Sequence, residues 1–589
     1  MKVNYEFYQN KNDKITKEED LILKFSEKFN KDIEQLENEA TLDEILALSK
    51  IRENILSWYP FKEDSRILEV GANIGELTGL LCEKAKEVVA VEDNKTKAEM
   101  IAKRHQIKNN LEVIAGRIQD IKFEKKFNYI ILIGFFERKD VYFKETIDIL
   151  MNYLTDDGII LLAMDNKLGI KYFSKTDKTG ITVANPVDTQ FINIDDICDY
   201  FQKIGFEGIN IYYPMPDWKL TNAIFTDLRP ISKSDLSRNV LYNSEDTIIF
   251  YDENVVYREL LNSKNKIAKN FANSFLIEIS KQKQNNDIKF VSFANMRKPE
   301  YRIKTIMKEG YVYKYPASKE SVRHIEETKE NIDIIKSAGL KTLDSYNEKG
   351  IISEFSPEKT LDEIIIELFK NDKRDEAINL MKNFQNEIKE KLQEGSIENN
   401  VFERYNIKVE KEELNKMYFL KNGLWDLIFQ NCFYINQEFY FYDQEWKEEN
   451  LPIDFIIYRA IKYFTRLKKY ISDEELYDIL EINSSMIKIF DELDDKIQEK
   501  IRNPIMWKLN TQGKSVMDLK RDTLTLNHQI NLLNIEKNQK EQEIAQKDEQ
   551  IIQKEQEIQN LRNQLNLVFN STSWKITKPL RKLKGLTKE

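Results

Sequence analysis

The chain has few of the residues on which small metal- or disulfide-stabilised domains depend. Its 589 residues include only three cysteines and three histidines. Cys82, Cys198 and Cys432 are far apart, and none belongs to a Cys-x-x-Cys pair. These counts argue against a structural zinc site and against a disulfide framework.

Long apolar runs and an excess of positive charge are missing as well. The first twenty residues contain no apolar signal segment, and no run approaches the roughly 18 apolar residues that a membrane span needs. The 90 basic and 100 acidic residues give a net charge of −10 and a pI near 5.4. A general nucleic-acid binder would show a basic domain. We therefore expect a cytoplasmic protein without a nucleic-acid partner.

The pattern of the chain divides it into regions, because 70.0 kDa is too large for one core. Up to about residue 230, short β-branched runs alternate with helical patterns, which predicts βα units around a parallel sheet. Strands and then helices follow, and a Gln-, Glu-, Lys- and Ile-rich segment typical of a long coil comes last. The predicted regions are an N-terminal helical segment (1–50), an α/β domain (51–235), a connecting segment (236–284), a second domain (285–505), a coil (517–568) and a basic tail (569–589).

A glycine-punctuated turn follows the first strongly apolar strand pattern. SRILEVGANIGELTGLL, residues 65–81, predicts a buried strand, a turn and a helix. Gly71 and Gly75 let the backbone turn sharply and approach a ligand closely. The next strand pattern, EVVAVEDN, ends at Glu92, where an acid would hold ribose hydroxyls.

These motifs resemble those of class I S-adenosylmethionine-dependent methyltransferases, over roughly residues 50–230. The resemblance implies that Glu92 binds the ribose of S-adenosylmethionine and that Ile118 and Gln119 flank its adenine. Asn73 stands where the family usually has a glycine. The residues that would cradle the methionine part are Glu69, Gly71, Ala72, Asn73 and Gly75.

The same resemblance assigns two more strands. FNYIILIGFFE would be the fourth strand, with Gly134 and Glu137 near the sulfonium, and GIILLAMDNKLGIKYF would place Asp165 and Asn166 at the mouth of the site. INIYYPMPDW and NAIFTDL fit an antiparallel hairpin that closes the sheet. A nucleotide- or NAD-binding domain is the alternative, although the fingerprint G-x-G-x-x-G is missing.

A catalytic base is not obvious in this domain. Methyl transfer from a sulfonium is an in-line displacement, so a base matters only if the acceptor must lose a proton. Asp165, Glu137 and Tyr213 are candidates, but residues of these types are more often loop acids or core aromatics than bases.

A second candidate site lies in the aromatic-rich stretch GLWDLIFQNCFYINQEFYFYDQEW. Asp426 and Asn431 are five residues apart, and Asp443 follows the strand pattern EFYFYD. The intervening CFYINQEFYFY predicts two strands around a turn at Asn436–Gln437. Such a hairpin would bring the three polar side chains to one end, although all of them are also common as solvated turn residues.

The spacing and order resemble the aminoglycoside- and choline-kinase branch of the protein-kinase fold, over roughly residues 285–500. The resemblance gives Asp426 the acceptor hydroxyl, and Asn431 and Asp443 the magnesium ions that accompany ATP. It places Lys314, in the third of three consecutive strands, on the α- and β-phosphates. A helix glutamate would pair with Lys314, the candidates being Glu326, Glu327 and Glu330.

Further parts follow or depart from that family. GIISEFSPEKTLDEII resembles the segment that holds adenine, with Glu354 and Phe355 supplying backbone contacts. Leu424 and Trp425 replace the usual His and Arg, YDQEW replaces D-F-G, and the first turn lacks glycine. Arg297 or Lys298 would then grip phosphate. Lys314 as a solvated strand lysine and a catalytically inactive kinase fold are the alternatives.

The last regions suggest self-association and surface attachment. Isoleucines recur every heptad at 544, 551 and 558, which predicts a coiled-coil dimer or trimer; one solvated helix is the alternative. If residues 519–567 are all helical, the rod is about 70 Å long. The tail carries six basic residues against one acid together with Trp574, so we predict reversible binding to an anionic membrane surface; a plain basic terminus fits equally well.

The complete order resembles bifunctional kinase–methyltransferases that terminate bacterial O-antigen chains. The expected fold is multidomain: a Rossmann-like α/β class I methyltransferase, a bilobal α+β kinase-like domain and a long α-helical coiled coil. The resemblance implies phosphorylation of a terminal sugar and methylation of the phosphate, with a lipid-linked polysaccharide acceptor, S-adenosylmethionine, ATP and Mg²⁺. It also implies a glycosyltransferase or polymerase partner and a peripheral place at the inner face of the cell membrane. Direct methylation of a sugar hydroxyl, a non-carbohydrate acceptor such as a small alcohol or lipid headgroup, and a non-catalytic scaffold are the rivals.

Overall fold

A computed structural model describes residues 2–9, 24–25, 28, 40–138, 141–176, 194–262, 267–284 and 287–585. The chain forms two compact units, Met1–Gly513 and Lys514–Glu589. Most of the predicted N-terminal helical segment lies outside the described residues. Its described end is helical, with α3 at Leu42–Leu48 and a 3₁₀ turn η1 at Lys50–Ile55.

The first unit contains the predicted parallel sheet. The strands β4, β3, β2, β5 and β6 lie side by side in that order, all parallel, with the short β1 (Val3–Asn4) beyond β4. Helices α4 (Thr78–Lys84), α5 (Lys95–Arg104) and α6 (Phe143–Met151) connect them. Nearly continuous apolar runs form these strands because helices cover both faces of such a sheet. The strand bounds are β2 Arg66–Val70, β3 Glu87–Glu92, β4 Leu111–Ala115, β5 Phe127–Ile133 and β6 Leu154–Asp165.

The strands beyond β6 show that one predicted domain boundary is wrong. β7 (Gly208–Met215) and β8 (Ala223–Thr226) form the expected antiparallel hairpin. However, β10 (Ser274–Ser280) lies between β6 and β7 and is antiparallel to both. The predicted connecting segment 236–284 therefore supplies a central strand of the first domain. All seven residues of β10 are buried, as its place between two strands inside the sheet requires.

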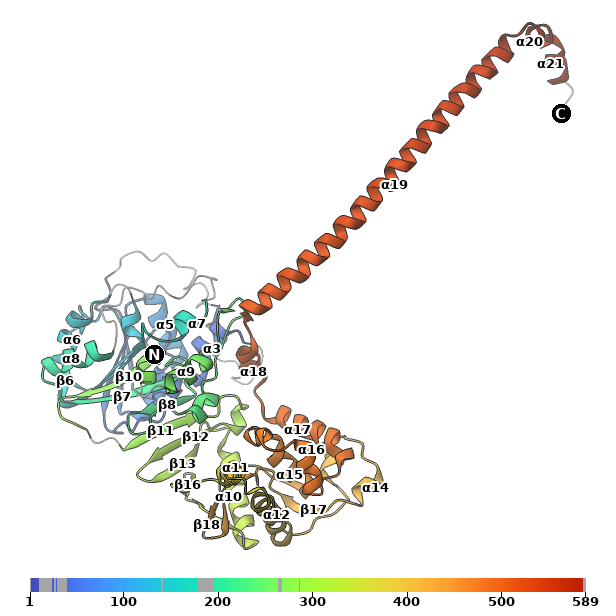
Figure 1. The fold of residues 1–589 in the computed structure, drawn as a ribbon. Helices are drawn as coiled ribbons and strands as arrows, with labels where there is room; N and C mark the ends of the chain where they lie inside the picture. The colour runs from blue at the N-terminus through green and yellow to red at the C-terminus, as the bar shows by residue number, and fades with distance from the viewer. Residues whose placement is uncertain are drawn as a thin grey trace. The chain divides into compact units, whose positions relative to one another are not determined.

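The second half of the first unit continues the same sheet (Figure 1). β8 pairs with β11, and the sheet goes on through β12, β13, β16 and β15, all antiparallel. Helix α10 (Val322–Ser337) follows β13, as predicted. The three strands predicted before it are present as β11 Ile288–Phe293, β12 Ile303–Lys308 and β13 Tyr311–Pro316, and the two later ones are β15 Asp344–Tyr346 and β16 Ile351–Glu354.

Helices dominate the remainder of this unit. α11 (Leu361–Lys370), α12 (Arg374–Lys391), α15 (Ile453–Lys462) and α17 (Ile487–Ile501) enclose a large apolar core. The predicted hairpin is present as β18 (Cys432–Ile435) and β19 (Glu438–Phe441). Both of its turn residues have positive φ angles of 51° and 65°, as a two-residue type I′ turn requires.

The second unit is mainly one helix, α19 (Val516–Asn570), of 55 residues (Figure 1). Ser515 and Asp518 cap its start reciprocally. The isoleucines of the predicted seam are about half exposed along this helix, at 54% for Ile551. Two short helices follow, α20 (Thr572–Ile576) and α21 (Lys578–Gly585), and the Arg581 guanidinium lies 3.4 Å from the centre of the Trp574 ring. No helix in the described parts of the chain has both the length and the apolar character to cross a bilayer.

Candidate functional site

The glycine turn after β2 borders the first cavity of interest. Gly71 has a φ of +72° and Asn73 a φ of +48°, so the backbone bends in the left-handed region. A Cβ on Gly71 would lie 2.5 Å from the Phe135 ring, which leaves no room for a side chain. Glu69, Gly71, Ala72 and Asn73 line a cavity of about 560 Å³.

Gly75 has a different role from the one the sequence predicts. It is not among the residues that line this cavity. Its carbonyl oxygen lies 2.8 Å from His105 Nε2, and a Cβ at this position would lie 2.9 Å from the same nitrogen. Gly75 therefore shapes the turn through its packing against His105.

Glu92 ties the end of β3 to the glycine turn. One carboxylate oxygen accepts the Asn73 N–H at 2.9 Å, and the other accepts the Asn94 N–H at 3.1 Å. The side chain lines the cavity, where burial raises its pKa to about 8 and neighbouring Asp93 adds to the effect. The next acid, Asp93, pairs with Arg138 and lines the cavity too.

The predicted adenine-flanking residues lie at an adjoining hollow. Ile118 and Gln119 line a small cavity of about 30 Å³ together with Gly116. This hollow shares the walls Gly71 and Phe135 with the main cavity. The residues assigned to the methionine, ribose and adenine parts, except Gly75, therefore line two cavities that share walls.

The other end of the cavity is formed at the end of β5. Gly134 has a φ of +70° and lines the cavity, and a Cβ here would lie 2.5 Å from the Trp218 ring. Trp218, in the turn between β7 and β8, packs against this glycine. Its indole N–H donates to Glu137 Oε1 and Asp165 Oδ1, both at 2.9 Å.

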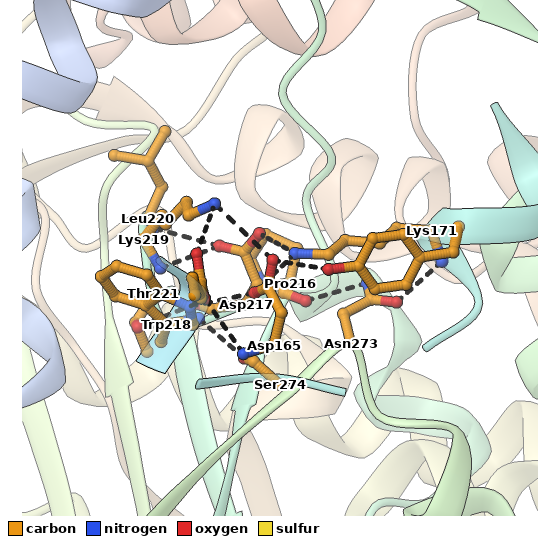
Figure 2. A network of polar contacts seen from close by, with 12 residues as sticks. Asp165, Lys171, Pro216, Asp217, Trp218, Lys219, Leu220, Thr221, Asn273 and Ser274 are labelled. Atoms are coloured by element: carbon orange, nitrogen blue, oxygen red, sulfur yellow. Dashed lines mark hydrogen bonds and ion pairs between the residues drawn. The ribbon is translucent and has the colours of Figure 1, made fainter. Parts of the chain in front are cut away.

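A network of buried charges surrounds Trp218 (Figure 2). Lys171 Nζ lies 2.9 Å from Asp165 and 3.1 Å from Asp217, and the Tyr172 hydroxyl donates to Asp165 at 2.7 Å. The Lys219 ammonium lies 3.6 Å from both Glu137 and Asp165. Asn166, predicted at the mouth, is buried and donates to the carbonyl groups of residues 270 and 272 instead.

The network shifts the pKa values of the two carboxylates at the mouth, Glu137 and Asp165, in opposite directions. Burial and the nearby Asp165 raise the pKa of Glu137. Burial alone would raise the pKa of Asp165 too, but the Lys171 and Lys219 ammonium groups hold it well below its usual value. When environments push two acids apart in this way, the group with the raised pKa is suited to accept a proton. Glu137 is therefore the better candidate for a base, and it also lines the cavity.

Arg52 is a cavity residue that the sequence did not single out. It is 7% exposed, and its Nη1 donates to the Lys219 carbonyl at 2.7 Å. Its Nε has no hydrogen-bond partner among the described residues. The guanidinium lies 4.8 Å from the centre of the Trp218 ring. A buried guanidinium with an unused donor in a cofactor-sized cavity is suited to bind a carboxylate.

The four residues of the second candidate site come together in the other half of the unit. Lys314, on β13, forms an ion pair with Asp443. The Asn431 amide donates to the Asp426 carbonyl at 3.2 Å, and Gln444, next to Asp443, donates to the same oxygen at 2.9 Å. β13, the loop before β18 and the end of β19 therefore meet at one place.

The predicted helix partner of Lys314 is wrong. Glu326 pairs with Lys329, Glu327 with Arg323, and Glu330 lies 3.6 Å from Lys447. The second partner of Lys314 is Glu445, at 3.1 Å, which is buried and also pairs with Arg297. The buried face of α10 presents His324 and Asn331, not a glutamate, to this region, and His324 Nε2 lies 3.5 Å from Glu445.

Asp426 receives a cation from a distant helix. Arg459 of α15 lies 3.6 Å from the Asp426 carboxylate, and its guanidinium lies 4.3 Å from the centre of the Trp425 ring. Burial raises the pKa of Asp426 to about 6, although the Arg459 charge opposes this shift. Trp425 stands where the resembled kinases have an arginine, and Arg459 of α15 brings an arginine to the same place.

The predicted adenine-binding segment begins where β16 ends. Glu354 pairs with Tyr311 in the sheet. The Phe355 N–H, which the resemblance assigned to adenine, donates to the Gly310 carbonyl at 2.8 Å. The N–H that the resemblance assigned to adenine is thus already bonded to the turn between β12 and β13. Arg297, proposed as a phosphate grip, is likewise committed to Glu445.

The donor chemistry at Asp443 and Asn431 suits Mg²⁺ only in part. Mg²⁺ prefers oxygen ligands and is commonly held by one or two side chains together with substrate phosphates. Asp443 and Asn431 offer such oxygens, but Asp443 is paired with Lys314. In the described part of the chain, no cluster of three or more His, Cys, Asp or Glu side chains could hold a metal ion by itself.

Comparisons with known proteins concern the first domain. A family model described as "Methyltransferase domain" matches residues 34–211. An uncharacterized methyltransferase of Staphylococcus carnosus is 33% identical over 127 residues, which are 21% of this chain and 58% of that protein. Ribosomal RNA small subunit methyltransferase A of Mesoplasma florum is 25% identical over 172 residues, 28% of this chain and 60% of that protein. The chain thus spans less than two thirds of these curated relatives.

Among solved structures, a methyltransferase of Thermotoga maritima, described as a possible histamine N-methyltransferase, is 14% identical with a TM-score of 0.27. The similarity covers 45% of this chain and 97% of that chain. Residues 34–211 thus match a methyltransferase-domain family model, and the strand order around them is the doubly wound one that the sequence motifs predicted. The sequence motifs did not single out Arg52, which lies in η1, or assign a site role to Trp218, which lies between β7 and β8.

Proposed function

We propose that the protein is an S-adenosylmethionine-dependent methyltransferase whose donor binds in the 560 Å³ cavity beside the glycine turn. One observation carries the proposal: the turn after β2, the acid at the end of β3 and the mouth after β5 border the same cavity. When bound, S-adenosylmethionine supplies the methyl group as a sulfonium. The chain positions donor and acceptor, which is the main requirement of an in-line displacement.

Binding of the donor tests this proposal directly. Calorimetry with S-adenosylmethionine should show one site per chain. Glu92→Gln should weaken binding at least about tenfold, because Glu92 uses two acceptor oxygens, on the N–H groups of Asn73 and Asn94, and an amide offers only one. Glu87→Gln, at the exposed start of the same strand, is the matched control and should leave the affinity unchanged. Equal affinities for both variants would contradict the assignment of Glu92.

We infer that the methyl acceptor belongs to the end of a surface polysaccharide and that the second half is an ATP-dependent phosphotransferase. The convergence of Lys314, Asp426, Asn431 and Asp443 supports the second part. Two contacts support it as well: Lys314 of β13 pairs with Asp443, and Asn331 of α10 donates to the Gln444 carbonyl, so both elements reach the segment after the hairpin. In this scheme a terminal sugar is phosphorylated first and its phosphate is methylated second.

An order-of-addition experiment tests the relay. Purified protein is incubated with a glycan acceptor and labelled S-adenosylmethionine, with and without ATP and Mg²⁺. The relay predicts methyl transfer only in the presence of ATP, and Asp426→Asn should abolish it. Methylation that proceeds equally without ATP would instead support direct methylation of a sugar hydroxyl, with Glu137 as the base and a second half that only binds ligand.

The second unit supports a self-associating protein at a membrane surface. An isolated helix with a half-exposed isoleucine seam is expected to pair with further copies of itself.

Exposed Ile576, Leu580 and Leu583 accompany the lysines of the tail. Co-sedimentation with vesicles containing phosphatidylserine, and loss of binding in high salt, would support attachment through these residues. Calorimetry with S-adenosylmethionine and with ATP tests the alternative of a pure scaffold. A protein that bound neither compound would be a scaffold for a glycosyltransferase partner.

A further inference from the structure

An apolar cavity on the first domain has no role in the function proposed so far. Its walls come from β7 and β8, from the segment after β8, and from helix α9 (Glu253–Asn262) with the 3₁₀ turn η4 (Ile267–Phe271) that follows it. Its volume is about 630 Å³, which is in the range of small-molecule pockets, and none of its lining residues lines the donor cavity. We propose that this cavity, defined here as the α9 cavity, binds a hydrocarbon chain that ends in an anionic group.

The wall of the α9 cavity is mostly apolar. Apolar surface in contact with water costs free energy in proportion to its area, so a hydrocarbon that covers this wall binds favourably. Sheet, loop and helix all contribute large apolar side chains, which are Met215, Phe225, Ile231, Tyr257, Leu260 and Leu261. The body of the ligand is therefore expected to be apolar.

The polar groups inside the wall are already bonded within the protein. The Thr226 hydroxyl donates to the Lys289 carbonyl at 2.8 Å, and the Tyr257 hydroxyl donates to the Phe271 carbonyl at 3.1 Å. Both of these hydroxyl side chains are buried. A sugar or a nucleoside in this cavity would bury several hydroxyl groups without partners, and each of them would weaken binding. The hydrogen bonds of the wall thus favour a hydrocarbon over a polar ligand.

The charged side chains of the lining stand at the mouth of the α9 cavity. The Lys269 ammonium lies 2.9 Å from the Asp227 carboxylate, and these side chains are 47% and 55% exposed. The Tyr213 hydroxyl donates to the same carboxylate at 3.1 Å. Burial and this carboxylate raise the pKa of Tyr213, so its phenol stays neutral at physiological pH. Tyr213, a candidate base in the sequence, therefore lines this cavity and is bonded to Asp227.

The mouth keeps a positive charge after this ion pair has formed. Lys233 is exposed, lines the cavity and has no ion pair among the described residues. The lining therefore carries two lysines against one aspartate, in a chain whose net charge is −10. A carboxylate or phosphate at the end of the hydrocarbon would meet Lys233, whereas a cationic head group would be repelled. An apolar interior with a free cation at its opening matches an anionic amphiphile.

Calorimetry on the full-length protein with ten-carbon amphiphiles, kept below the concentrations at which they form micelles, tests the proposal. Decanoate should bind at least about tenfold more tightly than decylammonium, because the two head groups have opposite charges. It should bind at least about a hundredfold more tightly than butanoate, which lacks six of its methylene groups. Decyl phosphate is included because the tighter of the two anions identifies the head group as carboxylate or phosphate. Equal binding of decanoate and decylammonium, or no binding of either anion, would overturn the proposal.

Variants locate the binding. Lys233→Gln removes the free ammonium from an exposed side chain and should reduce the preference for decanoate over decylammonium to less than about threefold. Lys203→Gln, at an exposed position of α8 (Ile194–Lys203), is the matched control and should keep the preference. Leu260→Trp fills the cavity from α9 and should weaken decanoate binding at least about tenfold. Val255→Trp, at a 50% exposed position of the same helix, should not.

Two results from these variants would overturn the proposal. Decanoate binding that survives Leu260→Trp would place the chain outside the α9 cavity, for example on the exposed apolar side chains of the tail. A preference that survives Lys233→Gln would place the head group elsewhere.

Binding of S-adenosylmethionine is measured in the same variants. It should not change, because the two cavities share no lining residue. If Leu260→Trp lost S-adenosylmethionine as well, the fold of the domain would be damaged, and Lys233→Gln would decide. Binding of the amphiphile is therefore tested independently of the proposed methyl transfer.

Discussion

The six-membered ring of Trp218 packs directly against the backbone of Gly134, where any side chain on the glycine would meet it at 2.5 Å. This contact fixes the indole at the mouth of the donor cavity, with its N–H on Glu137 and Asp165. This wall of the cavity therefore depends on the glycine directly after β5 and on a turn that lies some eighty residues further along the chain.

Gly134→Ala should disrupt this wall. The new methyl group would displace Trp218, and the positive φ adds about 1 to 2 kcal/mol of backbone strain. We expect at least about tenfold weaker binding of S-adenosylmethionine by calorimetry. Gly310→Ala is the control, because it has a φ of +80° with no atom within 4 Å of its Cβ. Equal donor affinity in the two variants would show that the contact with Trp218 does not shape the cavity.

Arg52 should distinguish donors with and without a carboxylate. The wild type is expected to bind S-adenosylmethionine more tightly than decarboxylated S-adenosylmethionine, by about 1.5 to 3 kcal/mol for a charge-assisted hydrogen bond. In Arg52→Gln this preference should disappear, because the guanidinium that would bind the carboxylate is gone. The ratio of the two affinities corrects for any general damage to the cavity. Arg66→Gln, which removes a cation from over the Phe127 ring, should retain the preference. A preference unchanged in Arg52→Gln would assign the carboxylate to another residue.

Ionisation of the buried Asp426 side chain should lower the stability of the fold at neutral pH. Its pKa rises from 3.8 to about 6 on burial, so between these values the folded state binds more protons than the unfolded state. The free energy of unfolding therefore falls as pH rises through this window and stays lower above it. Asp426→Asn should be more stable than the wild type by about 2 to 3 kcal/mol at pH 7.5 and equally stable near pH 4.

Melting temperatures of the two proteins at both pH values check this expectation. Asp156→Asn, at a side chain that is 94% exposed, should show no comparable pH-dependent gain. Loss of stability in Asp426→Asn at pH 7.5 would mean that the pairing with Arg459 outweighs the cost of burying the charge.

Glu445 should stabilise the second half of the first unit. Its buried carboxylate faces Arg297, Lys314 and His324, so Glu445→Gln leaves two cations without enough negative charge. Breaking a buried pair in this way costs about 3 to 5 kcal/mol, which should lower the melting temperature by several degrees. Glu327→Gln removes the exposed pair with Arg323 on α10 and should change stability by less than about 0.5 kcal/mol. Similar melting temperatures for both variants would contradict the role of Glu445.

The seam of α19 should control the oligomeric state. Ile551→Glu places a charge in the predicted interface, and the protein should shift to monomers in sedimentation analysis. Gln546→Glu adds a charge to the same helix outside the seam and should leave the mass unchanged. A wild-type protein that sediments as a monomer would make α19 a solvated helix.

The sequence predicted those features that local patterns determine. The glycine turn at residues 71–75, the hairpin around Asn436–Gln437 and helix α10 follow from turn chemistry and periodicity, and the structure has them. The insertion of β10 between β6 and β7 could not be predicted in the same way. A buried strand of seven residues has the same pattern whether it starts a new domain or completes an earlier sheet, and only long-range pairing distinguishes the two.

The sites show the same division. Residues within a motif, such as Glu92 and Asp443, could be proposed from the sequence because their spacing is local. Arg52 and Arg459 were missed, because each reaches its site from a segment distant in sequence. The partner of Lys314 was sought on α10, where the family resemblance put it, but its surface-facing glutamates pair with nearby cations instead. Glu445 is only two residues beyond Asp443, and no spacing rule had drawn attention to it.

The central place of β10 has a consequence for the newly synthesised chain. β6 and β7 are complete long before residues 274–280 emerge from the ribosome, and each then has an unpaired edge. Exposed edges of this kind invite pairing with other nascent chains. At about 5 to 20 residues per second, the delay of some sixty residues after β7 lasts several seconds. Premature termination before Ser274 should therefore yield an aggregation-prone product and not a shorter working methyltransferase domain.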